Sequence, residues 1–197
     1  MAPRSLLDRE LLDTLETVEC RALQVQTWRV AWRSQNVLRG GQNGRWNPPP
    51  IFALYTSLDI DGAVSEVYSL LSKMPVFSSA GKLIYQLAVR TQNTLILDEA
   101  DNLKRVGVDL CASPEKNIAQ CQRVGEAAYR LDCDSLLVPS MRWECNNLVL
   151  FQDVIDPADI KAAEAPHEIN WPAWSEKNAE VSRAYTRRFR KEKHNMK

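Results

Sequence analysis

Residues 44–67, with the sequence GRWNPPPIFALYTSLDIDGAVSEV, place an arginine, a tyrosine and a glutamate in three successive elements. Arg45 lies in a turn rich in glycine, asparagine and proline, and the three consecutive prolines hold the backbone extended and exclude a helix. A short strand is expected next, from Ile51 to Tyr55. Acidic residues then favour a helix start, and the sequence predicts a helix from about Ile60 to Met74 that contains Glu66.

In the predicted helix, Glu66 falls inside an apolar stripe whose members recur at three- and four-residue spacing. The stripe consists of Ala63, Val67, Leu70, Leu71 and Met74. An ionised carboxylate that faces inward is costly unless a cation or hydrogen-bond donors meet it, so this position predicts a polar cleft at Glu66. The alternative is a glutamate at the edge of the stripe that reaches solvent, and the spacing alone leaves both options open.

Upstream of this stretch, an amphipathic helix is expected from Ser5 to Val18 as a docking segment. The alternating residues of Thr27–Arg33 then predict a strand with Arg29 and Arg33 on one face. A solvated strand face is the simpler interpretation of these two arginines. The nearby Arg45 favours a role in ligand binding instead.

Downstream of the helix, two apolar segments around a short polar connection, 134–140 and 147–151, indicate a hairpin. Ser140 ends its first strand, where the hydroxyl could line a cleft or, as turn serines ordinarily do, bond to its own backbone. The other expected elements are strands over 82–89 and 94–97, a helix that starts at Ser113–Glu115, an irregular segment over 156–174 that packs its two tryptophans on the body, and a basic helix or tail over 179–197.

Composition indicates an ordinary globular protein that is long enough for one domain. The 25 basic and 25 acidic residues give zero formal net charge, which argues against nucleic-acid binding through a basic surface. The basic tail is the local exception, and contact with an acidic partner or nucleic acid is the minority interpretation of it. No apolar run could span a bilayer and the first residues lack the features of a signal peptide, so a cytoplasmic protein is expected.

Cysteine and histidine usage argues against several kinds of site. The five cysteines contain no C-x-x-C pair and are expected to be reduced and structural: Cys20, Cys111, Cys121, Cys133 and Cys145. Only two histidines are present, His167 and His194, both near the C-terminus. The sequence therefore favours neither a zinc site nor a histidine-based catalytic triad.

Several of these pieces occur in an order that resembles one known family. The matching pieces are Trp28-Arg29-Val30, Gly44-Arg45-Trp46-Asn47-Pro48, Leu54-Tyr55-Thr56, Ala63 with Glu66, Val138-Pro139-Ser140 and Asn147-Leu148-Val149-Leu150-Phe151. The set resembles the RES domain, which is named for its arginine, glutamate and serine. The resemblance covers roughly Gln26 to Phe151. Pro49 and Pro50 depart from it, because many relatives have a glycine soon after the Asn-Pro of this turn.

The resemblance implies an α+β fold similar to that of ADP-ribosyltransferases, in which helices flank a mixed, mainly antiparallel split sheet of one compact domain. It divides the chain into an N-terminal docking helix (1–25), a catalytic domain (26–153) and a C-terminal extension with the basic tail (154–197). Nothing about the tail is inherited from the family.

The resemblance also implies a function. RES proteins are typically the toxins of bacterial toxin–antitoxin pairs, and they consume NAD+ as substrate without a metal. Some release nicotinamide to water or phosphate, while others pass ADP-ribose to a protein. The implied partner is a DNA-binding antitoxin of the Xre type, with no membrane contact and no nucleic-acid contact except through the antitoxin; a homodimer is one option for the oligomeric state. A catalytically inactive module that binds a partner is the alternative in another class.

Carried over to this chain, the resemblance names Glu66, Arg29 and Tyr55 as catalytic residues. Glu66 would be the central carboxylate, since cleavage of the bond between nicotinamide and ribose leaves positive charge on the sugar.

The resemblance assigns NAD+ binding to Arg29, Arg45, Tyr55, Ser140 and Asn147. The two arginines would hold the phosphates, because guanidinium groups donate paired, charge-assisted hydrogen bonds to phosphate oxygens. Tyr55 would stack on nicotinamide or ribose and Ser140 would shape the ribose side of the pocket. Arg33 is a rival to Arg29, although the Trp-Arg-Val context favours Arg29.

Overall fold

The computed structural model describes residues 9–76, 81–110, 112 and 114–191. Within these residues, helices flank one seven-stranded sheet, and the α+β single-domain fold expected from the sequence is confirmed. The strands are β1 (Cys20–Trp32), β2 (Ala53–Ser57), β3 (Lys82–Ile96), β4 (Ser135–Pro139), β5 (Asn146–Phe151), β6 (Ile160–Ala162) and β7 (His167–Glu168). The helices are α1 (Arg9–Leu15), α2 (Ile60–Leu71), α3 (Ala100–Arg105), α4 (Pro114–Arg130) and α5 (Trp171–Lys191), with a 3-10 turn η1 (Pro157–Asp159).

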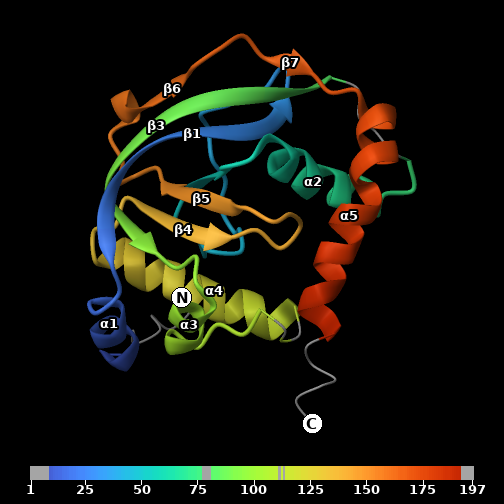
Figure 1. Ribbon diagram of the computed structural model, residues 1–197. Coiled ribbons are helices and arrows are strands. Elements are labelled where there is room, and N and C mark those ends of the chain that lie inside the picture. Colours follow the sequence, from blue (N-terminus) through green and yellow to red (C-terminus); the bar gives the residue numbers. More distant parts are fainter. Residues whose placement is uncertain (1–8, 77–80, 111, 113, 192–197) are drawn as a thin grey trace.

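The sheet is mixed and mainly antiparallel, as predicted. Its strand order is β1-β2-β5-β4-β3-β6, β7 pairs with β3, and β3 and β4 form the one parallel pair among the described strands. Because β1 also pairs with β3 along most of its length, the pairings close a circuit through five strands. Figure 1 shows the long β1 and β3 arching over the β4–β5 hairpin. One side of this hairpin packs against α4, and the other packs against β3 beneath the arch.

Strand β3 is one continuous element where the sequence predicts two. The polar residues that interrupt its apolar pattern are buried and satisfied. Thr91 and Thr94 are fully buried, and their hydroxyls lie 2.5 Å apart, with Thr94 bonded in turn to Ser135 at 2.7 Å. Asp134 accepts from the backbone N–H groups of Gln92 and Asn93. In this part of β3 the polar network takes the place of the apolar contacts that are typical of a buried strand. The alternation of apolar residues therefore does not show that β3 is one strand.

Helix α2 begins as predicted. Asp59 is its N-cap, and the carboxylate accepts a 2.9 Å hydrogen bond from the Gly62 N–H. The helix ends at Leu71, and the predicted apolar stripe is wrong at its far end, because Leu70 and Met74 are 62% and 52% exposed. The buried face contains Ala63, Val64 and Leu71, which pack with Ile84 and Trp171. Contact with the sheet and with α5 therefore sets which face of α2 is buried.

The main core lies between α4 and the sheet. Its largest fully buried side chains include Phe151, Leu95, Leu97 and Leu136. Helix α1 packs on α4 through the same core, with Leu11 and Leu15 buried, and residues 5–8 and Ser113 of the predicted helices lie outside the described residues. In Figure 1, α1, α3 and α4 form the lower part of the molecule, whereas α2 and α5 lie at the side of the hairpin.

The C-terminal segment is more regular than the sequence predicts. Strands β6 and β7 pair with β3, and α5 starts at Trp171 where an irregular segment was expected up to residue 174. The tryptophans of this segment do pack on the body, with Trp171 6% exposed. Strand β1 starts at Cys20, so the sheet takes in residues from both segments, 1–25 and 154–197, that the sequence places outside the catalytic region.

No helix in the part of the chain that the structure describes is long and apolar enough to cross a membrane. The described cysteines Cys20, Cys121, Cys133 and Cys145 are free thiols, as the sequence predicts for the cysteines in general.

Candidate active site

A cavity of about 340 Å³ lies where β1, β2, α2, the turn before β2 and the β4–β5 hairpin meet. Its charged lining residues are one carboxylate, Glu66, and three arginines, Arg29, Arg45 and Arg142. Each arginine comes from a different element, and α2 provides the carboxylate. The cavity therefore gathers groups that are far apart in the sequence and carries an excess of positive charge.

Glu66 points into this cavity and is held by donors from the hairpin. Its Oε1 accepts a 2.9 Å hydrogen bond from the Ser140 hydroxyl and a 3.3 Å bond from the Asn147 Nδ2 group. Both bonds go to the same oxygen, so Oε2 remains available to a ligand. The polar cleft expected from the position of Glu66 is present, and among the described residues two neutral donors, without an ion-paired cation, stabilise the carboxylate.

Ser140 is fully buried directly after β4. Its hydroxyl donates to Glu66 and also accepts a 3.1 Å hydrogen bond from the backbone N–H of Arg142. The two roles that the sequence left open therefore coexist. Ser140 bonds to its own turn backbone, and the same turn aims the hydroxyl proton at Glu66.

Asn147, on β5, lies opposite Ser57 in the sheet. Its Nδ2 group donates to Glu66, while its Oδ1 atom is buried and has no hydrogen-bond partner in the structure. A buried acceptor without a donor is costly, and such atoms are rare in folded proteins. Asn147 is nevertheless part of the cavity lining, so this partly unsatisfied amide stands at the wall of the candidate site.

Arg29 reaches the cavity from β1 and is largely enclosed. Its Nη1 group donates to the Tyr55 carbonyl at 2.8 Å, Nη2 donates to the Arg39 carbonyl at 3.4 Å, and the buried Nε has no partner within the described residues. Burial lowers the pKa of the Arg29 guanidinium from its ordinary value. Arg29 thus ties β1 to β2 at the cavity wall and also contributes positive charge there.

The rival arginine, Arg33, follows the end of β1 and faces solvent. It forms a 2.8 Å ion pair with Glu168 of β7 in which both side chains are more than half exposed. Arg33 is absent from the cavity lining. Of the two arginines that share a strand face in the sequence pattern, only Arg29 reaches the candidate site.

Arg45 and Tyr55 are linked through the turn of Gly44–Asn47. The Tyr55 hydroxyl accepts from the Trp46 N–H and donates to Asn47 Oδ1, each at 2.8 Å. Gly44 packs so closely that an added Cβ would overlap the Tyr55 hydroxyl oxygen, so this position requires glycine. Burial raises the pKa of the Tyr55 phenol well above its ordinary range, so the hydroxyl stays neutral. It anchors the turn, while the ring remains part of the cavity lining.

The Arg45 side chain extends from this anchored turn toward α4. Its Nη1 group donates a 2.8 Å hydrogen bond to Asn117 Oδ1, and Asn117 is 3% exposed. One edge of the guanidinium is thereby fixed by a neutral partner, and the charge itself is not neutralised. Asn117 is a supporting residue that sequence reasoning missed.

Arg142 is the third arginine of the cavity, and sequence reasoning also missed it. It lies in the β4–β5 loop, residues 140–145, two positions after Ser140. The position of a cation in the same turn as a serine at a strand end was the available signal. None of the three cavity arginines forms an ion pair within the described part of the chain.

Among the described residues no group of three or more histidine, cysteine, aspartate or glutamate side chains is placed to hold a metal ion. The chemistry of the site is that of a hydrogen-bonded carboxylate facing guanidinium groups and aromatic rings.

Comparison with known families agrees with this arrangement. The family model described as the RES domain matches residues 20–172, most of the chain. The chain belongs to the RES domain family. Glu66 on α2, Ser140 after β4 and Arg29 on β1 all lie within the matched RES range, as do the other cavity residues named above.

One solved structure supports the fold assignment. A chain in the crystal structure of the M. tuberculosis MbcT–MbcA toxin–antitoxin complex superposes on this RES chain with a TM-score of 0.74 and 19% sequence identity. The match covers 88% of this chain and 99% of that chain. No curated protein matches the sequence.

Proposed function

We propose that this RES-domain chain is the toxin of a toxin–antitoxin pair and that it cleaves the bond between nicotinamide and ribose in NAD+. The observation that carries the proposal is the Glu66 carboxylate, held by Ser140 and Asn147 in a cavity lined by three arginines that have no carboxylate partner among the described residues.

The charge of the cavity suits a dinucleotide. NAD+ carries two negative charges on its pyrophosphate, and Arg45 and Arg142 have guanidinium groups that no carboxylate neutralises within the described residues. Arginine binds phosphate oxygens through paired, charge-assisted hydrogen bonds. Arg29 adds positive charge to the wall, although two of its donors are already bonded to carbonyl groups.

The apolar and neutral parts of the cavity suit the nicotinamide riboside half of the molecule. The rings of Trp28 and Tyr55 line the cavity and offer flat surfaces to a base. Asn147 also lines the cavity and adds a polar amide to the wall beside Glu66.

The proposed reaction breaks the bond between C1′ of ribose and the pyridinium nitrogen. The bonding electron pair leaves with nicotinamide and neutralises its ring, so positive charge develops on the ribose. The Glu66 carboxylate stabilises that charge or orients the ribose hydroxyls. An oxygen of water or of inorganic phosphate then bonds to C1′, and the acceptor gives up its proton to solvent.

The fixed position of the carboxylate is central to this mechanism. A carboxylate that already accepts two hydrogen bonds needs little reorganisation when charge develops beside it, and such preorganised groups contribute strongly to catalysis. Oε1 accepts both structural bonds, and Oε2 is left to act on the substrate.

The partner in this proposal is an antitoxin of the Xre type that covers the cavity, and the proposed compartment is the cytoplasm. The structural neighbour is itself part of a toxin–antitoxin complex. Co-expression with the adjacent gene product, followed by size-exclusion chromatography, would test whether a complex forms and whether it retains activity.

The decisive experiment measures NAD+ loss and nicotinamide release by the purified chain, with and without inorganic phosphate. Glu66→Gln keeps the shape of the side chain and removes its charge, and we expect it to lower kcat by about 10²–10³-fold. Glu99→Gln is the matched control, since Glu99 lies outside the cavity and makes no side-chain cap to α3. Equal NAD+ turnover by wild type and Glu66→Gln would contradict the proposal.

The same assay separates the alternative functions. Label from the adenylate half of NAD+ that becomes bound to protein would indicate a protein ADP-ribosyltransferase. The absence of NAD+ loss, together with unchanged toxicity of Glu66→Gln in cells, would indicate an inactive module that binds a partner.

A further inference from the structure

Helix α5 contacts both elements that build the Glu66–Ser140 pair. Only its first two residues, Trp171 and Pro172, fall within the range matched by the RES model. In Figure 1, α5 runs beside α2 and past the turn of the β4–β5 hairpin. The helix therefore lies where it can fix the position of the Ser140 loop relative to the Glu66 helix.

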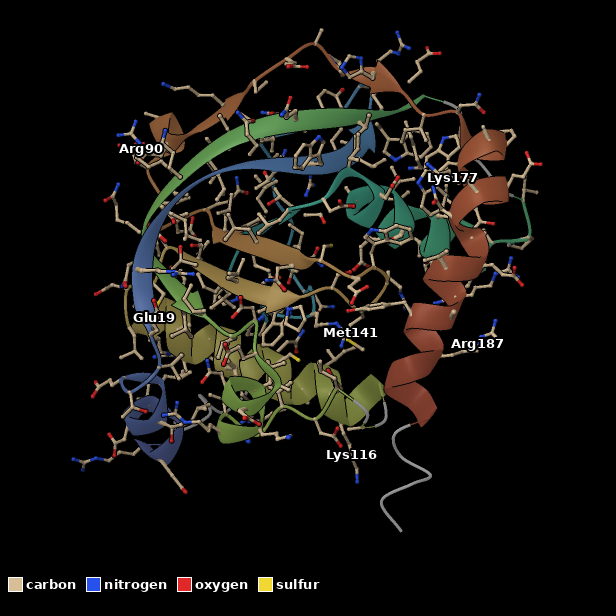
Figure 2. All side chains as sticks on the ribbon, viewed as in Figure 1. Glu19, Arg90, Lys116, Met141, Lys177 and Arg187 are labelled. Carbon is tan, nitrogen blue, oxygen red and sulfur yellow. The ribbon has the colours of Figure 1, made fainter. Side chains whose placement is uncertain are left out.

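The first contact joins α5 to the β4–β5 loop. The Ser182 hydroxyl, 4% exposed, donates a 3.1 Å hydrogen bond to the Arg142 carbonyl. The Thr186 hydroxyl lies 3.3 Å from the Met141 carbonyl and accepts a 3.5 Å bond from Arg142 Nη1. Figure 2 shows Met141 between the hairpin and α5, whereas Arg187 projects from α5 away from the body.

These bonds continue to the carboxylate. Arg142, whose carbonyl is held by Ser182, donates its backbone N–H to the Ser140 hydroxyl, and Ser140 donates to Glu66 Oε1. The first bond restrains the backbone of Arg142, whose N–H makes the second bond, and the second bond orients the hydroxyl that makes the third. The series is a path from a buried hydroxyl on α5 to the proposed catalytic group.

The second contact joins α5 to the helix that carries Glu66. Trp174 Nε1 donates a 2.7 Å hydrogen bond to Asp61 Oδ1 in the first turn of α2. The Trp174 ring also packs on Tyr68 of α2, with centroids 5.2 Å apart, and on Trp143 of the β4–β5 loop, with centroids 6.3 Å apart. One side chain of α5 thus contacts both sides of the site.

We propose that α5 positions the Glu66–Ser140 pair, with Ser182 acting through the Arg142 backbone and Trp174 acting through Asp61. Ser182 and Trp174 are positioning residues and not catalytic residues, because neither lines the cavity. The proposal rests on the proposed function for its kinetic consequences. Its structural claim, that Ser182 restrains the β4–β5 loop, is independent of the reaction.

The test compares Ser182→Ala with Ser175→Ala. Ser175 lies on the same helix but is only half-buried, and its hydroxyl donates to the Pro172 carbonyl of α5 itself. We expect Ser182→Ala to lower kcat about tenfold with KM within about twofold, since one hydrogen bond is removed at a distance from the substrate. Ser182→Thr keeps the hydroxyl and should restore kcat, and Ser175→Ala should match wild type.

A double-variant cycle separates positioning from a general loss of structure. If Ser182 acts through Ser140, adding Ser182→Ala to Ser140→Ala causes no further decrease in kcat. Independent effects that multiply in the double variant would overturn the proposal, as would wild-type kcat in Ser182→Ala. If Ser182→Ala does not fold, Trp174→Phe, which keeps a ring and removes the bond to Asp61, provides the corresponding cycle with Asp61→Ala in place of Ser140→Ala.

Amide hydrogen exchange tests the structural claim without NAD+. The Ser182→Ala variant should exchange faster than wild type in peptides that cover residues 140–145, and Ser175→Ala should not. Unchanged exchange in Ser182→Ala would overturn the positioning role even if the enzyme is active. Faster exchange in a chain that does not cleave NAD+ would support the role of α5 and contradict the proposed function.

Discussion

The Ser140 hydroxyl donates a 2.9 Å hydrogen bond to Glu66 Oε1 across a separation of 74 residues. The bond joins the end of β4 to the middle of α2, and each of the two side chains forms one further hydrogen bond. Ser140 is fixed by the Arg142 N–H, and Asn147 donates to the same carboxylate oxygen. These hydrogen bonds fix the Glu66 carboxylate to the β4–β5 hairpin, although its backbone belongs to α2.

Replacing Ser140 should therefore impair chemistry more than binding. We expect Ser140→Ala to lower kcat for NAD+ cleavage by about 10–100-fold, with a smaller change in KM, because the carboxylate loses one of its two donors. Steady-state kinetics measure both constants. Ser65→Ala is the matched control, since Ser65 is also fully buried but donates to the Gly62 carbonyl of its own helix. Equal losses in both variants would show that the effect comes from packing.

Arg45 should affect substrate binding. Its charge has no carboxylate partner in the described residues, and Arg45→Gln keeps a side chain that can still bond to Asn117. We expect an increase in KM of about tenfold with a smaller change in kcat, measured over a range of NAD+ concentrations. Arg33→Gln removes an exposed ion pair outside the cavity and should leave both constants unchanged. A KM that is unaffected in Arg45→Gln would remove Arg45 from the phosphate site.

The local elements around Glu66 could be predicted from the sequence. The cap at Asp59, the helix that follows and the hairpin that ends in Asn147–Phe151 follow from short-range signals, and the structure has all three. The contact between Glu66 and Ser140 could not be derived from periodicity. It depends on how the hairpin lies against α2, and only the resemblance to the RES domain placed both residues in one site.

The start of helix α5 and the third arginine were missed for different reasons. The proline at 172 suggested an irregular segment, but Pro172 stands in the first helical turn, where its missing N–H costs nothing, and Asn170 accepts from the Ala173 N–H as a cap. The sequence signal for Arg142 was weak, because it consists only of a cation two residues after Ser140 in a short polar turn. Contacts of Arg142 with Ser182 and Thr186 of α5 place it at the cavity, and contacts between such distant residues cannot be predicted from short-range sequence signals.

Gly125 should be essential for the geometry of the Arg45 turn. A Cβ at Gly125, in the middle of α4, would overlap the Trp46 carbonyl oxygen. Alanine normally stabilises a helix interior by about 1 kcal/mol relative to glycine. Here we expect Gly125→Ala to destabilise the fold by about 3 kcal/mol, because backbone cannot move aside as a flexible side chain can.

Chemical denaturation of the purified variant measures this change. Gly41→Ala is the control, since an added Cβ at Gly41 meets no atom within 4 Å, and it should change the unfolding free energy little. Stability of Gly125→Ala equal to that of wild type would show that α4 and the Trp46 turn are not packed as closely as the structure has them.

The buried thiol of Cys121 should make stability depend on pH above neutrality. Burial raises its pKa from 9.0 to about 11 in the folded chain, so the unfolded chain loses its thiol proton first as pH rises. The folded state binds more protons between these values, and the free energy of unfolding decreases from about pH 9 to about pH 11, by at most about 1.4 kcal/mol per pH unit for one thiol. Denaturant titrations at about pH 8, 9, 10 and 11, run under reducing conditions, would give the free energy of unfolding at each pH. Its slope against pH can then be compared with the slope expected for one titrating thiol. In Cys121→Ala this part of the slope should be absent, and an identical slope in the two proteins would show that Cys121 does not contribute.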